Sequence, residues 1–299
     1  MARIAITGAG GFIGRHLVRA LFATGQDPIA LLRRPDPAIF ADLLGIKLLS
    51  HPPASAPEAL ASLLKGTDVL VHAAATSPAP GIEIGDFVRD NILATQNLLA
   101  AARQAGVSRL IFLSAISGFG RPSVAELTEE TASTNPDAYG LSKRLAEAMV
   151  AEAVSRHDIE GALILRLPGV VGPGMRDPWL GRLARDLLQD KSVAIYNPLS
   201  LFNNAVHVDT AIHFIGAVAG RIADGLDHVN IAAGGPLPIA EVAEGLCHRL
   251  GSRSTIEVRT GGTSFTISTR RAEERYGFVP QDMQTLLDRL AADVLNEQA

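Results

Sequence analysis

The segment RIAITGAGGFIG (Arg3–Gly14) joins a short apolar run to the start of an amphipathic pattern. RIAIT predicts a buried strand and FIGRHLVRALFATG predicts a helix, so the glycines lie in the turn between them. Gly8 permits a tight turn, Gly11 allows a phosphate to approach the helix N-terminus, and Gly14 allows close packing of helix on strand. The alternative is a packing turn without a ligand, but a close backbone approach explains all three glycines at once. We therefore expect a dinucleotide to bind at Gly8, Gly11, Phe12, Ile13 and Gly14.

Short apolar runs and helical patterns continue to alternate through the first half of the chain. Further strands are predicted at 28–32, 46–50, 68–75, 109–114 and 161–167, and helices at 57–65, at 87–105 and from Tyr139 onward. Continuously apolar strands separated by amphipathic helices are typical of a parallel sheet covered on both faces. The expected fold is therefore a doubly wound α/β sheet of the Rossmann type, whose ligands lie at the carboxyl ends of the strands.

The pattern loosens after RLPGVVGPG (Arg166–Gly174), where proline and glycine mark a change of region. Helices are predicted at 179–189, 209–221, 239–250 and 281–297, and short strands at 193–195 and 206–208. We expect a dinucleotide-binding domain over residues 1–167. Residues 168–299 are expected to form mainly a smaller substrate lobe, with segments that return to the main sheet.

Composition excludes several classes of protein. The 299 residues are 47% hydrophobic and 19% charged, with a net charge of −4, so a large core is expected and a nucleic-acid partner is not. No uncharged apolar run approaches the roughly 18 residues that a spanning helix needs. Cys247 is the single cysteine, which fits a reducing compartment, and the eight histidines show no ligand-like clustering. A cytoplasmic protein without a metal site, acting on a small molecule, is expected.

Arg33 and Arg34 follow the second predicted strand, where an acidic residue would bind the adenosine ribose hydroxyls of NAD. Guanidinium groups pair instead with a 2′-phosphate, so Arg33 favours NADP as the cofactor. The alternative is a pair of solvated loop arginines, in which case NAD serves as well.

The segment YGLSK places Tyr139 and Lys143 four residues apart, on one face of a predicted helix. A tyrosine phenol has a reference pKa of about 10, and a neighbouring ammonium group stabilises the phenolate and lowers that pKa. Such a tyrosine can exchange a proton with a substrate hydroxyl or carbonyl while a hydride moves to or from nicotinamide. The alternative is an exposed Tyr–Lys pair on a helix surface. The glycine turn and the order of elements favour the catalytic role.

With these motifs the sequence resembles the extended short-chain dehydrogenase/reductase family, in its NAD-dependent epimerase/dehydratase branch, over almost the whole chain. The resemblance implies that Asp68 of DVLVHAAA supports the adenine side and that Ala73, Ala74 and Ala75 pass the pyrophosphate. It also implies that Asn91 lies near the active-site floor, that Lys143 holds the nicotinamide ribose, and that Pro168 flanks the nicotinamide.

Three positions depart from the pattern of that family. The carbonyl-polarising Ser or Thr of the family falls on Ala115, and an arginine that clamps the diphosphate of a nucleotide sugar is replaced by Asn203. A neutral amide cannot supply bidentate charge pairing, although Arg176 or Arg182 remains to do so. The acidic residue that contacts adenine is missing near Pro52, which affects affinity more than chemistry.

The missing hydroxyl raises a question about the two serines in FLSAISGFG, which flank Ala115. Side chains alternate along a strand, so Ser114 is expected to face away from the position of Ala115. Ser117 lies two residues beyond Ala115, in the predicted loop, and is our substitute donor, with water or a substrate hydroxyl as the alternative.

These features predict an NAD(P)-dependent oxidoreductase or epimerase that transfers a hydride at a hydroxyl/carbonyl carbon of a sugar-like substrate, with a nucleotide sugar among the candidates. Tyr139 is the predicted acid/base. The alternative is a dinucleotide-binding regulator with a degraded active site, which Ala115 favours and the Tyr139–Lys143 pair opposes. A homodimer through the helices at 87–105 and 139–155 is common in similar proteins.

Overall fold

The computed structural model describes residues 2–34, 36–52, 55–176, 178–261 and 264–297. Its chain forms two compact units, each assembled from separate stretches of sequence. The first unit comprises residues 1–120, 135–166 and 212–229, and the second comprises residues 121–134, 167–211 and 230–299. The chain therefore passes between the two units after residues 120, 134, 166, 211 and 229.

A seven-stranded sheet forms the centre of the first unit, in the order β12-β7-β5-β4-β1-β2-β3. The strands are β1 (Ile4–Thr7), β2 (Ile29–Leu32), β3 (Lys47–Ser50), β4 (Val69–His72), β5 (Arg109–Ala115), β7 (Gly161–Leu167) and β12 (Gly225–Asn230). β1 runs parallel to both of its neighbours, and Thr7 lies opposite Leu31 on one side and His72 on the other. The predicted doubly wound parallel sheet is confirmed.

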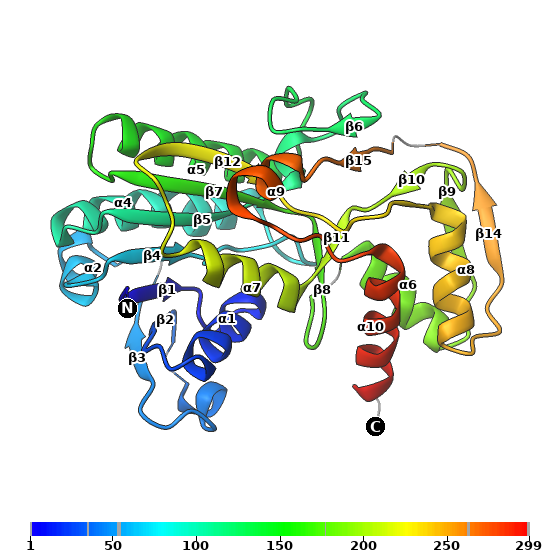
Figure 1. Cartoon of the computed structure of the whole chain (residues 1–299), viewed down its shortest axis with the longest axis horizontal. Helices are drawn as coiled ribbons and strands as arrows, with labels where there is room; N and C mark the ends of the chain where they lie inside the picture. Colours follow the sequence, from blue (N-terminus) through cyan, green and yellow to red (C-terminus); the bar gives the residue numbers. More distant parts are fainter. Residues whose placement is uncertain (1, 35, 53–54, 177, 262–263, 298–299) are drawn as a thin grey trace. The chain divides into compact units, whose positions relative to one another are not determined.

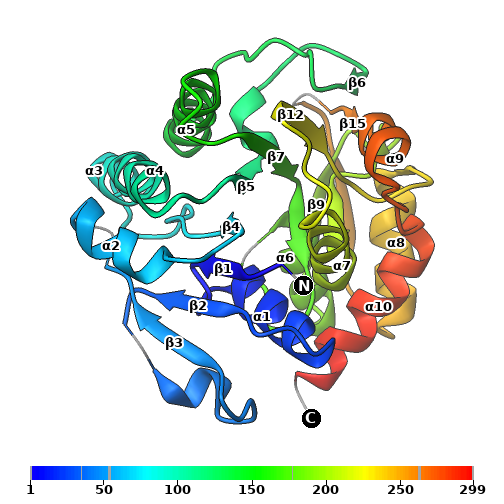
Figure 2. The same ribbon diagram turned by 60° about the vertical axis from the view of Figure 1, so that its left-hand side comes forward.

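Helices cover both faces of this sheet, as Figure 2 shows. The helices are α1 (Phe12–Ala23), α2 (Pro57–Leu64), α3 (Ile84–Phe87), α4 (Ala94–Ala105), α5 (Ala138–Ser155) and α7 (Val208–Val218), with short 3₁₀ turns η1 (Pro37–Phe40) and η3 (Ile116–Phe119). Leucines and alanines of α2, α4 and α5 pack in one buried cluster with side chains of β1, β2, β4, β5 and β7. α1 and α7 lie on the opposite face, where Gly216 of α7 approaches Leu21 of α1.

The single helix predicted at 87–105 is interrupted by a π-helical segment, η2 (Val88–Leu93). The wider turn carries Asp90 and Asn91 to the inside of the unit, where both are buried although their neighbours Arg89 and Val88 are exposed. Apolar periodicity does not distinguish a π turn from an α turn, and π turns often occur at functional sites. The predicted helix is present at 87–105, but its first part is a π-helix and not an α-helix.

The strand β12 was not predicted, although segments returning to the sheet were expected. Its sequence, GLDHVN, carries charged or polar side chains at Asp227 and His228. It lies at the edge of the sheet, beside β7, so only part of it is buried. An edge strand lacks the continuous apolar run by which its buried neighbours are recognised.

The second unit is built from short two-stranded sheets and four helices among its described residues (Figure 1). Its strands are β6 (Glu126–Leu127), β8 (Gly169–Val171), β9 (Val193–Tyr196), β10 (Leu201–Phe202), β11 (Ala205–His207), β13 (Leu237–Pro238), β14 (Ile256–Arg259) and β15 (Thr266–Ile267). Its helices are α6 (Trp179–Leu188), α8 (Ile239–Arg249), α9 (Arg270–Tyr276) and α10 (Met283–Asn296). The pairs are β11–β8, β14–β9, β15–β6 and β10–β13.

Candidate functional site

The glycine turn after β1 leaves no room for a side chain at Gly8 or at Gly14. Gly8 has a φ of +66°, and a Cβ there would lie 2.6 Å from the Cα of Ala74. A Cβ on Gly14 would lie 2.2 Å from the carbonyl oxygen of Gly8. Gly11 is the N-cap of α1 and supplies no capping side chain, so the first N–H groups of the helix can receive a phosphate. The residues present therefore fit a dinucleotide.

The segment leaving β4 lies against this turn. The N–H of Ala73 donates to the carbonyl of Thr7 at 3.3 Å, and the N–H of Ala74 donates to Thr7 Oγ1 at 3.3 Å. The close approach of Gly8 and Ala74 completes the contact. The structure thus brings together two of the predicted cofactor segments, the turn after β1 and the run Ala73–Ala75.

A chain of buried hydrogen bonds connects this turn to Asn91. Thr7 Oγ1 lies 2.7 Å from Nδ1 of His72, whose Nε2 lies 2.9 Å from Thr95 Oγ1, and that hydroxyl donates to the Asn91 carbonyl at 2.6 Å. Burial lowers the pKa of His72 well below its usual value, and the charge of Lys143 lowers it further. His72 is therefore neutral near pH 7, and the imidazole acts as a fixed link between the glycine turn and η2.

Asn91 holds the loop after β4 against α5. Its Oδ1 accepts from the Thr76 N–H at 2.7 Å, and its Nδ2 donates to the Thr76 carbonyl at 3.0 Å and to Ser142 Oγ at 3.0 Å. Ser142 in turn donates to the Tyr139 carbonyl at 2.7 Å. The buried amide thus fixes the first turn of α5, which carries Tyr139, relative to the segment that leaves β4.

Tyr139 and Lys143 lie one turn apart near the start of α5. The helix begins after Asp137, whose carboxylate accepts the N–H of Gly140 at 2.7 Å. Lys143 is buried, with its Nζ 4.3 Å from the centre of the Phe112 ring, whereas Tyr139 is half-buried. Burial lowers the pKa of Lys143 to about 8, although the charge of Glu147 opposes that shift.

The two serines flanking Ala115 occupy different environments. Ser114 Oγ donates to Oε1 of Glu147 at 2.5 Å, inside a buried network. Ser117 lies in η3, and its Oγ is buried without a hydrogen-bond partner among the described residues. Ser114 was expected to face away from the position of Ala115, and its hydroxyl is directed into the buried network of Glu147. The backbone of Ser117 packs against α5, because a Cβ on Gly140 would lie 2.2 Å from the Ser117 carbonyl oxygen.

Glu147 is the centre of that buried network, one turn beyond Lys143. Arg166 donates to both of its carboxylate oxygens, at 3.0 and 2.8 Å, and Arg144 donates at 2.7 Å. Burial would raise the pKa of Glu147, but the hydrogen bonds and charges of Arg166, Ser114 and Arg144 outweigh it and lower that pKa. Glu147 is therefore ionised, and its negative charge lies one turn of α5 from Lys143.

Arg33 directly follows β2, as predicted, but its guanidinium group is not free. Its Nη2 donates to Oδ2 of Asp90 at 2.8 Å, while more than half of its side chain stays exposed. Asp90 also accepts from Thr76 Oγ1 at 2.6 Å and from Arg89. Arg34 is exposed and carries no ion pair in the part of the chain that the structure describes.

Asp68 lies at the amino ends of the strands, whereas the role that the resemblance implied requires a place at their carboxyl ends. It precedes β4, and its Oδ2 accepts the N–H of Arg3, which precedes β1, at 2.7 Å. The amino ends of parallel strands lie together, and so do their carboxyl ends. Asp68 and the glycine turn therefore lie at opposite ends of the strands. The carboxylate here joins the starts of two strands, and we remove it from the predicted cofactor site.

Two predicted positions belong to the second unit. Pro168 follows β7 directly, in the stretch 167–211 of the second unit. Asn203 is buried, and its Nδ2 donates to the carbonyls of Ala233 at 3.1 Å and Ile267 at 2.9 Å, while its Oδ1 accepts the Ile267 N–H at 2.8 Å. Its amide is fully used by the backbone, so Asn203 cannot replace a diphosphate-clamping arginine.

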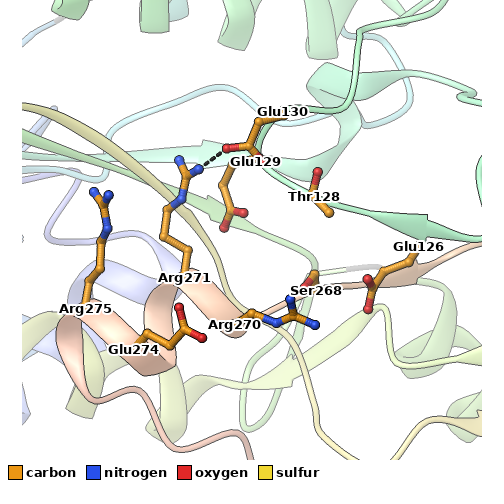
Figure 3. A pocket seen from close by; sticks show the side chains of 9 residues that line it. All are labelled: Glu126, Thr128, Glu129, Glu130, Ser268, Arg270, Arg271, Glu274 and Arg275. Atoms are coloured by element: carbon orange, nitrogen blue, oxygen red, sulfur yellow. Dashed lines mark hydrogen bonds and ion pairs between the residues drawn. The ribbon is translucent and has the colours of Figure 1, made fainter.

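A charged cavity of about 320 Å³ lies in the second unit, between the loop after β6 and α9 (Figure 3). Its lining residues are Glu126, Thr128, Glu129, Glu130, Ser268, Arg270, Arg271, Glu274 and Arg275. Arg271 and Glu130 form an ion pair across it. None of the residues predicted for catalysis or cofactor binding lines this cavity.

Sequence reasoning missed the residues that join the predicted ones, namely Thr76, Asp90, Gly140, Ser142 and Glu147. Ser142 and Gly140 lie inside YGLSK, and Asp90 directly precedes Asn91, so proximity to a motif was a usable signal for these. Thr76 directly follows Ala75 and had the same signal, whereas Glu147 lies outside every motif and its partners Ser114 and Arg166 are distant in the sequence. No group of three or more His, Cys, Asp or Glu side chains suited to a metal ion occurs among the described residues, and none of the helices described could cross a membrane.

The doubly wound sheet and its glycine turn define a Rossmann-type protein. Comparison with known proteins identifies the family: the model of the NAD dependent epimerase/dehydratase family matches residues 4–232. The chain belongs to this family.

Relatives carry several different activities. A ceramide reductase of Caulobacter vibrioides is 36% identical over 171 residues, which cover 57% of this chain and 47% of the reductase. The chain thus spans about half the length of that relative. A dTDP-glucose 4,6-dehydratase of Streptomyces griseus is 26% identical over 97% of this chain and 92% of its own length. The solved structure of MoeE5 in complex with UDP-glucose and NAD matches with a TM-score of 0.84 and 27% identity, covering 100% of both chains.

Proposed function

We propose that this protein is an NAD(P)-dependent oxidoreductase or epimerase that acts at a hydroxyl/carbonyl carbon, with Tyr139 as the acid/base. The observation that carries the proposal is the hydrogen-bonded path from the glycine turn through His72 and Asn91 to α5. This path fixes the glycine turn, where a dinucleotide would bind, and the helix of the Tyr139–Lys143 pair relative to each other.

Each residue of the site has a distinct task in this proposal. A bound nicotinamide supplies or accepts the hydride. Tyr139 exchanges a proton with the reacting oxygen, and the ammonium group of Lys143 stabilises the phenolate that results. Lys143 also holds the nicotinamide ribose. Because its pKa is about 8, Lys143 keeps most of its charge at neutral pH, and Glu147 beneath it helps to retain that charge.

Ser117 is our candidate for the carbonyl-polarising hydroxyl that Ala115 cannot provide. Its buried and unpartnered Oγ supports this role, since Ser114 is already bound to Glu147. The packing of Gly140 on the Ser117 carbonyl also fixes η3 next to the turn of α5 that carries Tyr139. Water or a substrate hydroxyl is the competing donor.

The cofactor of this family is of the NAD type, and we propose a preference for NADP. Arg33 and Arg34 follow β2, where the 2′ position of the adenosine ribose lies in doubly wound sheets. No carboxylate occupies either position to bind ribose hydroxyls. Phosphate binding by an arginine is charge-assisted, so the preference follows from these two side chains.

The substrate is proposed to be sugar-like, with the second unit as the lobe that selects it. Full use of the Asn203 amide by the protein backbone argues against a diphosphate clamp at that position. This favours net oxidation or reduction of a substrate without a nucleotide over epimerisation of a nucleotide sugar. The absorbance of reduced nicotinamide during turnover distinguishes the two, because an epimerase releases no net NADH or NADPH.

The central experiment is Tyr139→Phe, tested on a panel of sugars and ketones with NAD and NADP. The exchange removes one hydroxyl, so we expect kcat to fall at least 100-fold, the usual scale for general acid–base catalysis, with little change in cofactor affinity. Tyr196→Phe, at an exposed tyrosine of β9, is the matched control. Turnover within a few-fold of the unchanged protein would contradict the mechanism. Absence of turnover by the unchanged protein, with cofactor bound, would favour the regulator.

We also propose a homodimer through the first unit. Ile84, Val88 and Leu93 are exposed on α3 and η2, and Leu141 and Leu145 are exposed on α5, which contacts both. Exposed apolar side chains on adjacent helices are typical of an interface. Leu145→Asp is expected to give monomers in light scattering after size exclusion, whereas Leu44→Asp, at an exposed position elsewhere, is not. We propose a cytoplasmic location for the protein on the basis of its composition and its single cysteine.

A further inference from the structure

Arg33 and Asp90 form an ion pair that passes over the end of β1. In the sheet, β1 lies between β2 and β4, and Thr7 at its carboxyl end is opposite Leu31 and His72. Arg33 follows β2, whereas Thr76, which shares Asp90 with it, follows β4. The contact therefore joins the two strands on either side of the glycine turn, along the edge where a dinucleotide binds.

Two arginines share Asp90, and they are attached unequally. Arg89 donates to Oδ1 at 2.7 Å and to Oδ2 at 3.0 Å, and it is also paired with Asp86. Arg33 donates one hydrogen bond to Asp90, and its side chain is 54% exposed against 2% for Asp90. If Arg33 leaves, the buried carboxylate keeps Arg89 and the Thr76 hydroxyl, so no unpaired buried charge results. Arg33 is the partner that can be exchanged.

Asp90 carries its negative charge near neutral pH. Burial would raise the pKa of Asp90, but hydrogen bonds from Arg89 and Thr76 and the charge of Arg33 outweigh it and bring that pKa to about 2. Any phosphate that binds Arg33 must therefore compete with a full carboxylate charge.

We propose that Asp90 sets cofactor discrimination: it holds Arg33 in an ion pair beside the glycine turn, and a 2′-phosphate must take Arg33 from it. The carboxylate lowers the affinity for NADP and leaves that for NAD nearly unchanged, because a ribose hydroxyl does not compete for a guanidinium group. The inference rests on the proposed function in one respect, that a dinucleotide binds at the glycine turn, and it requires no turnover.

The test is calorimetric titration of the full chain with NADP⁺ and with NAD⁺. Asp90→Asn keeps the size of the side chain and an acceptor for Thr76, and it removes the competing charge. We expect NADP⁺ to bind roughly three- to tenfold more tightly and NAD⁺ to change less than about twofold. The gain in NADP⁺ affinity must disappear when Arg33→Ala is added. Asp86→Asn is the matched control, since Asp86 pairs with Arg89 and not with Arg33 among the described contacts.

Several results would overturn the inference. These are unchanged or weaker NADP⁺ binding by Asp90→Asn, an equal gain for both cofactors, a gain that persists without Arg33, or the same gain with Asp86→Asn. If neither cofactor binds the unchanged protein, the proposed function fails first and the inference fails with it. Binding of both cofactors without the expected pattern rejects the inference alone.

A second variant keeps the test decisive if Asp90→Asn does not fold. Arg33→Ala leaves Asp90 with Arg89 and Thr76, so the melting temperature should stay within about 2 °C of the unchanged protein. NADP⁺ affinity should fall at least tenfold, and NAD⁺ affinity should stay within about twofold. A loss of melting temperature as large as that caused by Arg89→Ala would show that Arg33 is a fixed structural partner and would reject the exchange.

Discussion

At the scale of single residues, the clearest result is the different fate of two neighbouring serines. Both follow the apolar run of β5, and both are candidates for a catalytic hydroxyl by residue type. Ser114 is committed to Glu147 at 2.5 Å, whereas the hydroxyl of Ser117 is buried without a partner among the described residues. A buried hydroxyl that already donates to a carboxylate has no proton left for a substrate carbonyl. The structure therefore assigns Ser114 to stability and supports the proposal for Ser117.

Substitution separates the two serines by different measurements. Ser114→Ala removes a donor to a buried carboxylate, so we expect the free energy of unfolding to fall by about 1–3 kcal/mol and kcat to stay within about threefold. Ser117→Ala leaves no buried group unpaired, so we expect little loss of stability and a loss near 100-fold in kcat, as for an oxyanion donor. Urea denaturation and steady-state kinetics check both. An unchanged rate in Ser117→Ala would assign the role to water or to a substrate hydroxyl.

At the scale of elements, the distance between η3 and α5 is set by the absence of a side chain. A Cβ on Gly140 would lie 2.2 Å from the carbonyl oxygen of Ser117 and 3.2 Å from the Asp137 carboxylate. The glycine in YGLSK is thus required by tertiary contact with a turn more than twenty residues earlier in the sequence. It brings the helix of Tyr139 and Lys143 against the turn of Ser117.

Gly140→Ala tests this contact. The added methyl group must push α5 away from η3, since the opposing atom is backbone, and overpacking of this kind costs about 1–3 kcal/mol. We expect lower stability and a loss of at least tenfold in kcat, because small displacements of catalytic groups are costly. Gly85→Ala is the control: nothing lies within 4 Å of its Cβ position. That change should stabilise the protein slightly, by about 0.4–1 kcal/mol, or leave it unchanged.

At the scale of the whole molecule, each unit is made of stretches that are distant in the sequence. The first unit takes back residues 212–229, which supply most of α7 and the edge strand β12, after the chain has built part of the second unit. Some titratable groups are buried when the first unit folds and become exposed when it unfolds. Two of these groups are histidines, and they give the stability of the molecule a defined dependence on pH.

Burial lowers the pKa of His51 to about 4 and that of His72 well below 6.5. In the unfolded chain both protonate near 6.5, so below this pH the unfolded state binds protons that the folded state does not. Stability is therefore fully present above pH 6.5 and is lost as the pH falls, by about 1.4 kcal/mol per pH unit for each histidine. For His51 the loss continues down to about pH 4.

Urea denaturation between pH 7 and pH 5 measures this loss. His51→Gln should reduce the slope of unfolding free energy against pH by up to about 1.4 kcal/mol per unit, because one histidine no longer contributes. His157→Asn, at an exposed position with a φ of 59°, should leave the slope unchanged. A slope that His51→Gln does not alter would show that other groups govern the acid side.

The sequence by itself determined the doubly wound sheet, the glycine turn and the Tyr139–Lys143 pair. These depend on spacing within one element or between adjacent ones, where apolar periodicity and the steric freedom of glycine act locally. It also indicated that Asn203 cannot act as a charged clamp, since this follows from residue type alone.

Only the tertiary structure decided which distant groups meet. Strand order and one π turn decide several of these contacts. They are the position of Asp68 at the amino ends of the strands, the partner of Ser114, the packing of Gly140 and the pairing of Arg33 with Asp90. Strand order places β1 between β2 and β4, and so brings Arg33 to a carboxylate 57 residues later in the chain. Local sequence patterns cannot predict such contacts, because the free energy of these contacts arises only when the sheet has assembled.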